Sequence, residues 1–200
     1  MKTLTDEQIF SNFEMFKGLC ESLGERSEPA LRMVNTLGER LALCPASSKL
    51  DFHLAIPGGL VDHSLRVLHN AHTYSKAFGW SIPKDSLIIG SLFHDLGKVG
   101  YESEGSDYYL PGDRWRAEKL GEMYSHNKSI QYMSVPNRGL WLCQHFGLSL
   151  TVDETLAILL NDGFFPTENK AYILKDPLLA HVVMTADYIS TRQEKEEFPA

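Results

Sequence analysis

The chain has few cysteines, no long apolar run and no excess of positive charge. Its three cysteines, Cys20, Cys44 and Cys143, are odd in number and widely spaced, which disfavours a disulfide framework or a zinc site made of paired thiolates. No uncharged run reaches the roughly 18 residues that suggest a membrane span. The first residues also lack the apolar core of a secretory signal. We therefore expect a cytoplasmic protein that has no membrane partner.

Acidic residues outnumber basic ones, with 26 Asp and Glu against 19 Lys and Arg, and the net charge is −7 at pH 7. Because duplex nucleic acid is bound through a basic face, this balance disfavours nucleic acid as a partner. A small-molecule phosphate remains compatible with it, since a local metal ion or lysine can hold an anion within an acidic protein. The sequence leaves the oligomeric state open, including a homo-oligomer.

A sustained alternation of apolar and polar residues, which would indicate strands, is also missing. Apolar residues recur instead at three- and four-residue steps, and this spacing predicts an all-α protein. The predicted helices cover about residues 5–23, 29–43, 59–78, 83–96, 114–133, 138–146, 151–161 and 176–191. A polar loop at 99–112, with a short hairpin near Gly105–Leu110, departs from this pattern.

The length of 200 residues fits one ordinary domain with a sizeable core. We expect the N-terminal helices, within residues 1–48, to pack on a helical bundle formed by residues 49–192. The chain is charged from Arg192 onward, and we expect residues 193–200 to form a frayed tail.

An imidazole and a carboxylate stand side by side in His94-Asp95, at the end of an apolar run. Burying such a pair is costly unless it is hydrogen-bonded, paired or bound to a metal ion. Several other ligand-type residues fall on predicted helices or helix ends. The full set is His63, His94, Asp95, His126, His145 and Asp187. Imidazole ligands favour a divalent transition metal. Two ions roughly 3.5–4 Å apart would use all six residues, with Asp95 as a bridge, whereas one catalytic ion needs fewer.

Three segments of the chain resemble the HD-domain superfamily of metal-dependent phosphohydrolases. Gly58-Gly59-Leu60-Val61-Asp62-His63-Ser64-Leu65 is similar to its first-ligand helix, Phe93-His94-Asp95-Leu96-Gly97-Lys98 to its naming motif, and Ala186-Asp187-Tyr188-Ile189-Ser190 to its final-ligand helix. The resemblance runs from about Phe52 to Thr191. It implies a helical bundle with a metal centre in its core, held at least by His63, His94, Asp95 and Asp187.

The number of ions depends on the two middle histidines. In dinuclear members of the superfamily, the positions that correspond to His126 and His145 hold the second ion. Gln144 stands where many relatives have a further histidine, so a centre with one ion and a centre with two both remain open. Mn²⁺ is our first choice of metal, and Fe, Co, Ni, Zn and Mg are alternatives.

The resemblance implies that a metal-activated water hydrolyses a phosphate ester or phosphoanhydride bond of a nucleotide or a similar small molecule. Asp95 would hold the ion and orient the nucleophile, and Lys98 would contact the phosphate. Two alternatives remain. The segment from Cys44 to Gly59 is similar to the HD domain of bacterial 3′-5′ exoribonucleases, which suggests a phosphodiesterase or exonuclease acting on cyclic nucleotides or RNA ends. The other alternative is a non-catalytic sensor that binds a nucleotide.

Three arginines are further candidates for contacts with the substrate. Arg66 lies one turn after His63 and would either bind phosphate or pair with an acidic residue. Arg114 and Arg116 flank a tryptophan, and would either hold a nucleotide or form a solvated helix face. His53 is the remaining histidine to note, because it lies just before the first-ligand segment.

Overall fold

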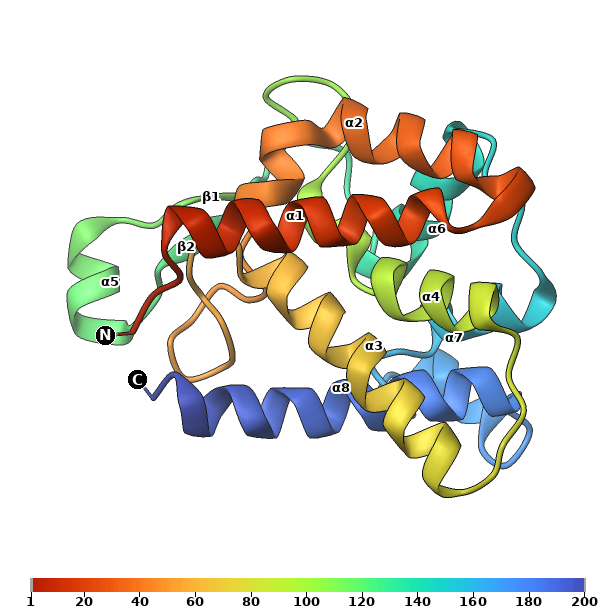
Figure 1. The fold of residues 1–200 in the computed structure, drawn as a ribbon. Helices are drawn as coiled ribbons and strands as arrows, with labels where there is room; N and C mark the ends of the chain where they lie inside the picture. Colours follow the sequence, from red (N-terminus) through yellow and green to blue (C-terminus); the bar gives the residue numbers. More distant parts are fainter. Residues whose placement is uncertain (1, 200) are drawn as a thin grey trace.

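Helices account for most of residues 2–199, the part of the chain that the computed structural model describes (Figure 1). The α-helices are α1 (Asp6–Glu21), α2 (Ser27–Leu43), α3 (Gly59–Ala77), α4 (Lys84–Phe93), α5 (Arg114–Leu120), α6 (Val135–His145), α7 (Val152–Leu159) and α8 (Leu178–Glu197). Short 3₁₀ helices cover η1 (Gly24–Arg26), η2 (Leu96–Val99) and η3 (Thr167–Tyr172). The predicted all-α class is confirmed. None of the helices in residues 2–199 combines the length and the apolar character that crossing a membrane requires.

Local capping fixes where two of the predicted helices begin. The Thr5 hydroxyl accepts the backbone N–H of Gln8 at 3.2 Å, and the Gln8 side chain accepts the N–H of Thr5 at 2.8 Å. The same reciprocal pair joins Thr151 and Glu154 at the start of α7. Each of these two capping boxes satisfies backbone N–H donors that the start of a helix leaves without partners.

Helix α4 lies at the centre of the bundle. It packs against α3, α7 and α8, and Figure 1 shows it below the pair α1 and α2. Every residue from Ser86 to Phe93 is buried, as expected of a helix that is apolar on all sides. The His94-Asp95 pair therefore follows directly from a core helix. The turn after it is fixed by α6, because a Cβ at Gly97 would collide with the backbone oxygen of Val135.

The helix predicted over 114–133 is wrong beyond its first two turns. Helix α5 ends at Leu120, where Gly121 takes a left-handed conformation with φ of 63°. None of the α5 residues is buried, so no tertiary packing favours extending the helix. The chain continues into strand β2 (Tyr124–His126), which pairs antiparallel with β1 (Tyr109–Pro111). The hairpin expected near Gly105–Leu110 is reduced to an isolated bridge between Gly100 and Asp107.

The expected fraying after Arg192 is also wrong, because α8 continues to Glu197. Glu194 is fully buried on the inner face of this last part of the helix. Glu197 forms ion pairs with Lys2 at 2.8 Å and with Arg66 at 2.7 Å. These contacts attach the end of α8 to α3 and to the N-terminal segment.

A buried ion pair connects η1 to α7. The Arg26 guanidinium donates to both carboxylate oxygens of Glu154, at 2.9 and 2.8 Å. Glu154 has no exposed side-chain surface, whereas 23% of the Arg26 side chain is exposed. Burial alone would raise the pKa of Glu154, but the Thr151 N–H and the guanidinium outweigh it and hold the pKa below its ordinary value of 4.5.

We expect Arg26→Ala to lower the free energy of unfolding by about 2 kcal/mol at pH 7, less than a fully buried pair would cost, because Arg26 is partly exposed. The Glu154 contribution is present above pH 4.5 and is lost as the pH falls through its lowered folded-state pKa. The difference between the variant and the wild type should therefore shrink in acid.

Urea unfolding at pH 7 and at low pH measures this difference. Arg114→Ala, which removes an exposed pair with Glu118, is the control and should cost less than about 0.5 kcal/mol. A loss in Arg26→Ala that is no larger than this control would contradict the prediction.

Candidate metal centre

Three helices bring four of the predicted ligands to one point in the core. His63 lies on the inner face of α3, His94 and Asp95 follow α4, and Asp187 lies on α8. Both histidines have no exposed side-chain surface, and Asp95 has 7%. We call His63, His94, Asp95 and Asp187 the four-residue cluster.

The donor atoms of this cluster are close together. The Nε2 atom of His63 lies 3.0 Å from Oδ1 of Asp187 and 3.2 Å from Nε2 of His94. Oδ2 of Asp95 lies 3.5 Å from Nε2 of His94 and 3.9 Å from Nε2 of His63. The donor atoms of His63, His94 and Asp187 thus lie within 4.8 Å of one another, and Asp95 lies beside the two imidazoles.

Hydrogen bonds to the other ring nitrogens fix the orientation of both imidazoles. The Nδ1–H of His63 donates to Glu194 at 2.9 Å, and the Nδ1–H of His94 donates to the backbone oxygen of Ser91 at 2.8 Å. Both Nε2 atoms are therefore directed into the cluster. Metal-bound histidines are held in the same way by carboxylates and carbonyls.

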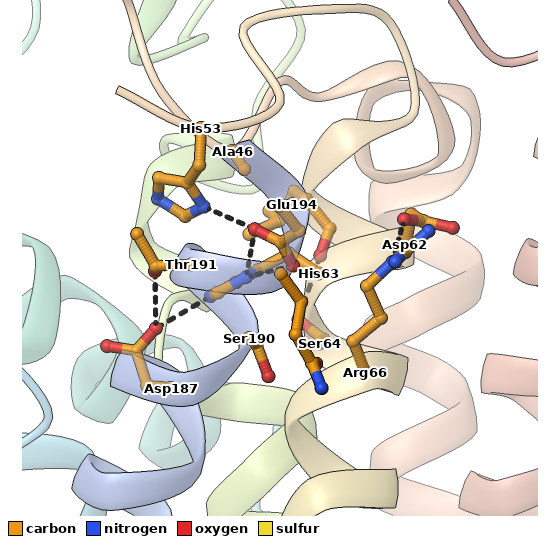
Figure 2. A network of polar contacts seen from close by, with 12 residues as sticks. Ala46, His53, Asp62, His63, Ser64, Arg66, Asp187, Ser190, Thr191 and Glu194 are labelled. Atoms are coloured by element: carbon orange, nitrogen blue, oxygen red, sulfur yellow. Dashed lines mark hydrogen bonds and ion pairs between the residues drawn. The ribbon is translucent and has the colours of Figure 1, made fainter. Parts of the chain in front are cut away.

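Glu194 is a residue of this centre that sequence reasoning missed. Figure 2 shows its carboxylate between His63 and His53, and the Nδ1 atom of His53 lies 2.8 Å from it. The sequence predicts a frayed tail at this position, and Glu194 carries no motif. One signal was available: Glu194 follows Asp187 by seven residues, which is two helical turns along the same face.

Asp95 is held through both of its oxygens. Oδ2 accepts from Lys98 Nζ at 2.5 Å, and Oδ1 accepts from the Asn161 amide at 3.2 Å. The same amide also donates to the backbone oxygen of His94 at 3.2 Å. Burial alone would raise the pKa of Asp95, but the charges of Lys98 and His94 outweigh it and hold the pKa well below its usual range.

The charges around His63 favour its protonated form when no metal is present. Burial opposes that charge, but Glu194 and Asp187 outweigh burial and raise the pKa of His63 to about 10. The pKa of Glu194 is lowered to about 2, because His63 and His53 outweigh the effect of its burial. The positive charge of protonated His63 thus balances the carboxylates of Asp187 and Glu194. A bound metal ion would balance the same charges in its place.

The four residues fit a divalent transition metal. Imidazole nitrogen with carboxylate oxygen is the donor set that Mn, Fe, Co, Ni and Zn accept. Neighbouring atoms bound about 2.1 Å from one ion lie roughly 3.0–3.4 Å apart, for right-angle or tetrahedral geometry. The closest pairs of the cluster, at 3.0 and 3.2 Å, already have this spacing.

The structure does not bring His126 and His145 into the cluster. His126 is exposed on β2, where its ring stacks on Tyr108 with centroids 4.8 Å apart. His145 is exposed at the end of α6 and stacks on Trp141, also at 4.8 Å. The stop at Gly121 explains the position of His126, which follows a turn instead of lying on a long helix.

The predicted substrate-binding arginines are engaged with acidic residues. Arg66 lies 2.6 Å from Asp62 and 2.7 Å from Glu197, and Figure 2 shows its guanidinium directed at Asp62. Arg114 pairs with Glu118, and Arg116 with Glu122, both on the exposed surface of the α5 region. Lys98 is the predicted cation that does contact the cluster.

A cavity of about 640 Å³ lies beside Asp187. Its walls are the segment 161–165, which follows α7, and residues of α8 between Met184 and Tyr188. The Asp187 side chain is 23% exposed, whereas both histidines are fully buried. The cluster is therefore open to solvent on the side of Asp187.

Comparison with known proteins gave one match. A family model described as the HD domain matches residues 60–192, a range that includes the whole four-residue cluster. No curated protein and no solved structure matches the chain.

We expect Glu194→Gln to weaken Mn²⁺ binding about 10- to 100-fold, because loss of the carboxylate charge reduces the basicity and orientation of His63. Isothermal titration calorimetry on metal-free protein measures the affinity. Glu196→Gln on the exposed face of the same helix is the matched control and should bind Mn²⁺ like the wild type. A folded Glu194→Gln variant with wild-type affinity would contradict this role.

Proposed function

The chain belongs to the HD-domain family, and from this premise we propose that it is a metal-dependent phosphohydrolase acting on a nucleotide or a similar small phosphate compound. The observation that carries the proposal is the convergence of His63, His94 and Asp187, whose donor atoms lie within 4.8 Å of one another, with Asp95 3.5 Å from His94 and 3.9 Å from His63. When bound there, a divalent ion supplies an activated water at neutral pH and neutralises charge on the phosphoryl oxygens.

Asp95 is suited to a fixed role in the reaction. Lys98 and Asn161 hold its two oxygens, and its lowered pKa keeps it ionised at neutral pH. A carboxylate that cannot rotate costs no reorganisation when it binds an ion or orients a nucleophile. This arrangement supports the role expected for Asp95.

Lys98 has one hydrogen-bond donor left for the substrate. An ammonium group carries three N–H donors. One is directed at Asp95 and a second at the backbone oxygen of Ala46, at 2.7 Å. The third is available to a phosphoryl oxygen next to the cluster, where a positive charge stabilises the transition state of phosphoryl transfer.

The position of His126 and His145 supports a centre with one ion. Both are exposed and stacked on aromatic rings, away from the cluster. A dinuclear centre would suit cleavage of a phosphodiester, so this placement favours hydrolysis of a phosphate ester or phosphoanhydride. Mn²⁺ remains our first choice on the donor set.

We expect Asp187→Ala to lower Mn²⁺-dependent hydrolysis at least about 100-fold, because the variant loses a ligand of the centre. Hydrolysis should be measured with several divalent metal ions, and the substrates compared should be nucleoside mono- and triphosphates, cyclic nucleotides and short RNA. Asp153→Asn on the exposed first turn of α7 is the control and should retain activity.

Full activity in Asp187→Ala would contradict the proposed function. A wild-type protein that binds nucleotides but hydrolyses none of them with any divalent metal would favour the sensor alternative.

A further inference from the structure

The cavity beside Asp187 is continuous with the proposed reaction site. Asp187 lines the cavity and belongs to the four-residue cluster, and Asn161 lines it while donating to Asp95. Its volume of about 640 Å³ lies within the range typical of small-molecule sites. A substrate whose phosphate lies at the cluster would therefore extend its other end into this cavity.

Two exposed aromatic side chains lie at this cavity. Phe165 is 93% exposed and Tyr188 is 68% exposed, although a phenylalanine ring usually packs inside. They come from the two elements that line the cavity, the segment after α7 and helix α8. Exposed aromatic rings at a cavity are suited to stacking on a flat ring of a ligand.

The polar lining of the cavity selects against phosphate. Its lining residues include no lysine or arginine, and Asp162 is the carboxylate there in addition to Asp187. Within residues 2–199, the Asp162 carboxylate has no hydrogen-bond or ion-pair partner, while its backbone N–H donates to Asn161 at 2.9 Å. An ionised carboxylate only accepts hydrogen bonds. The cavity is therefore matched to a neutral aromatic ring that carries N–H donors.

On the basis of the proposed function, we propose that this cavity binds the nucleobase of a nucleotide substrate. Phe165 and Tyr188 stack on the base, and Asp162 accepts a hydrogen bond from its exocyclic amino group. The inference names the substrate class as nucleotides whose base carries an amino group, in preference to uracil or thymine. Phosphate binding stays with the four-residue cluster and Lys98.

The stacking role is tested with a Phe165→Ala/Tyr188→Ala double variant. Its substrates are cytidine nucleotides and base-free compounds with the same phosphate chain, namely ribose 5-phosphate for monophosphates and tripolyphosphate for triphosphates. We expect the ratio of kcat/KM for the nucleotide to kcat/KM for the base-free compound to fall at least about tenfold. The control is Phe10→Ala/Tyr132→Ala, which removes two exposed aromatic rings outside the cavity and should keep the wild-type ratio.

The role of Asp162 is tested with cytidine and uridine nucleotides, which differ in an amino group against a carbonyl at C4 and in an acceptor against an N–H at N3. The wild type should prefer cytidine. Asp162→Asn offers an amide donor in place of a carboxylate oxygen, so the preference should fall at least about tenfold or reverse. Mn²⁺ affinity, measured by calorimetry, reports whether the substitution has disturbed the neighbouring centre.

The outcomes separate the two proposals. If the metal-loaded wild type hydrolyses neither base-bearing nor base-free phosphates, the proposed function is overturned. If it hydrolyses both, but the double variant keeps the wild-type ratio and Asp162→Asn keeps the wild-type base preference, the cavity assignment alone is overturned.

Discussion

The buried hydrogen bond between Glu194 and His63 is the interaction on which the centre depends. It connects the last turns of α8 to the second turn of α3, and the second oxygen of the same carboxylate reaches His53 in the loop before α3. Without it, the His63 ring would have no fixed orientation, and a buried imidazole would face Asp187 and His94 with its other nitrogen unpaired. The same carboxylate also anchors the charged last turns of α8, together with the ion pairs of Glu197.

The elements of the fold that the sequence predicted well are those with a local physical signal. The capping residue Thr5, the apolar stripe of α3 and the wholly apolar α4 each specify a helix without reference to distant residues. The error over 114–133 arose because helical periodicity was extended past Gly121, although glycine after a basic last turn is a typical helix stop. The sequence does not show that the α5 residues are exposed, because their exposure depends on tertiary packing.

In the candidate site too, residues with a local sequence signal were predicted and residues that depend on tertiary contacts were not. Motif context and spacing singled out His63, His94, Asp95 and Asp187. The structure places the donor atoms of His63, His94 and Asp187 together, with Asp95 beside the two imidazoles, while their roles stay predictions. Glu194 and Asn161 were missed because their importance comes from contacts across the bundle rather than from neighbours in sequence. The arginines were ambiguous for the opposite reason, since each has an acidic residue within six positions that the helix or turn brings into contact.

The positions of the four ligands along the chain have a further consequence. His63 and His94 are 31 residues apart, and Asp187 comes from a distant helix, so a shared ion would close two long loops of the polypeptide. Such an ion acts as a reversible cross-link: it binds the folded state in preference to the unfolded chain and so stabilises it, in a protein whose three cysteines are buried and free. Metal supply would then affect the stability of the folded protein as well as its chemistry.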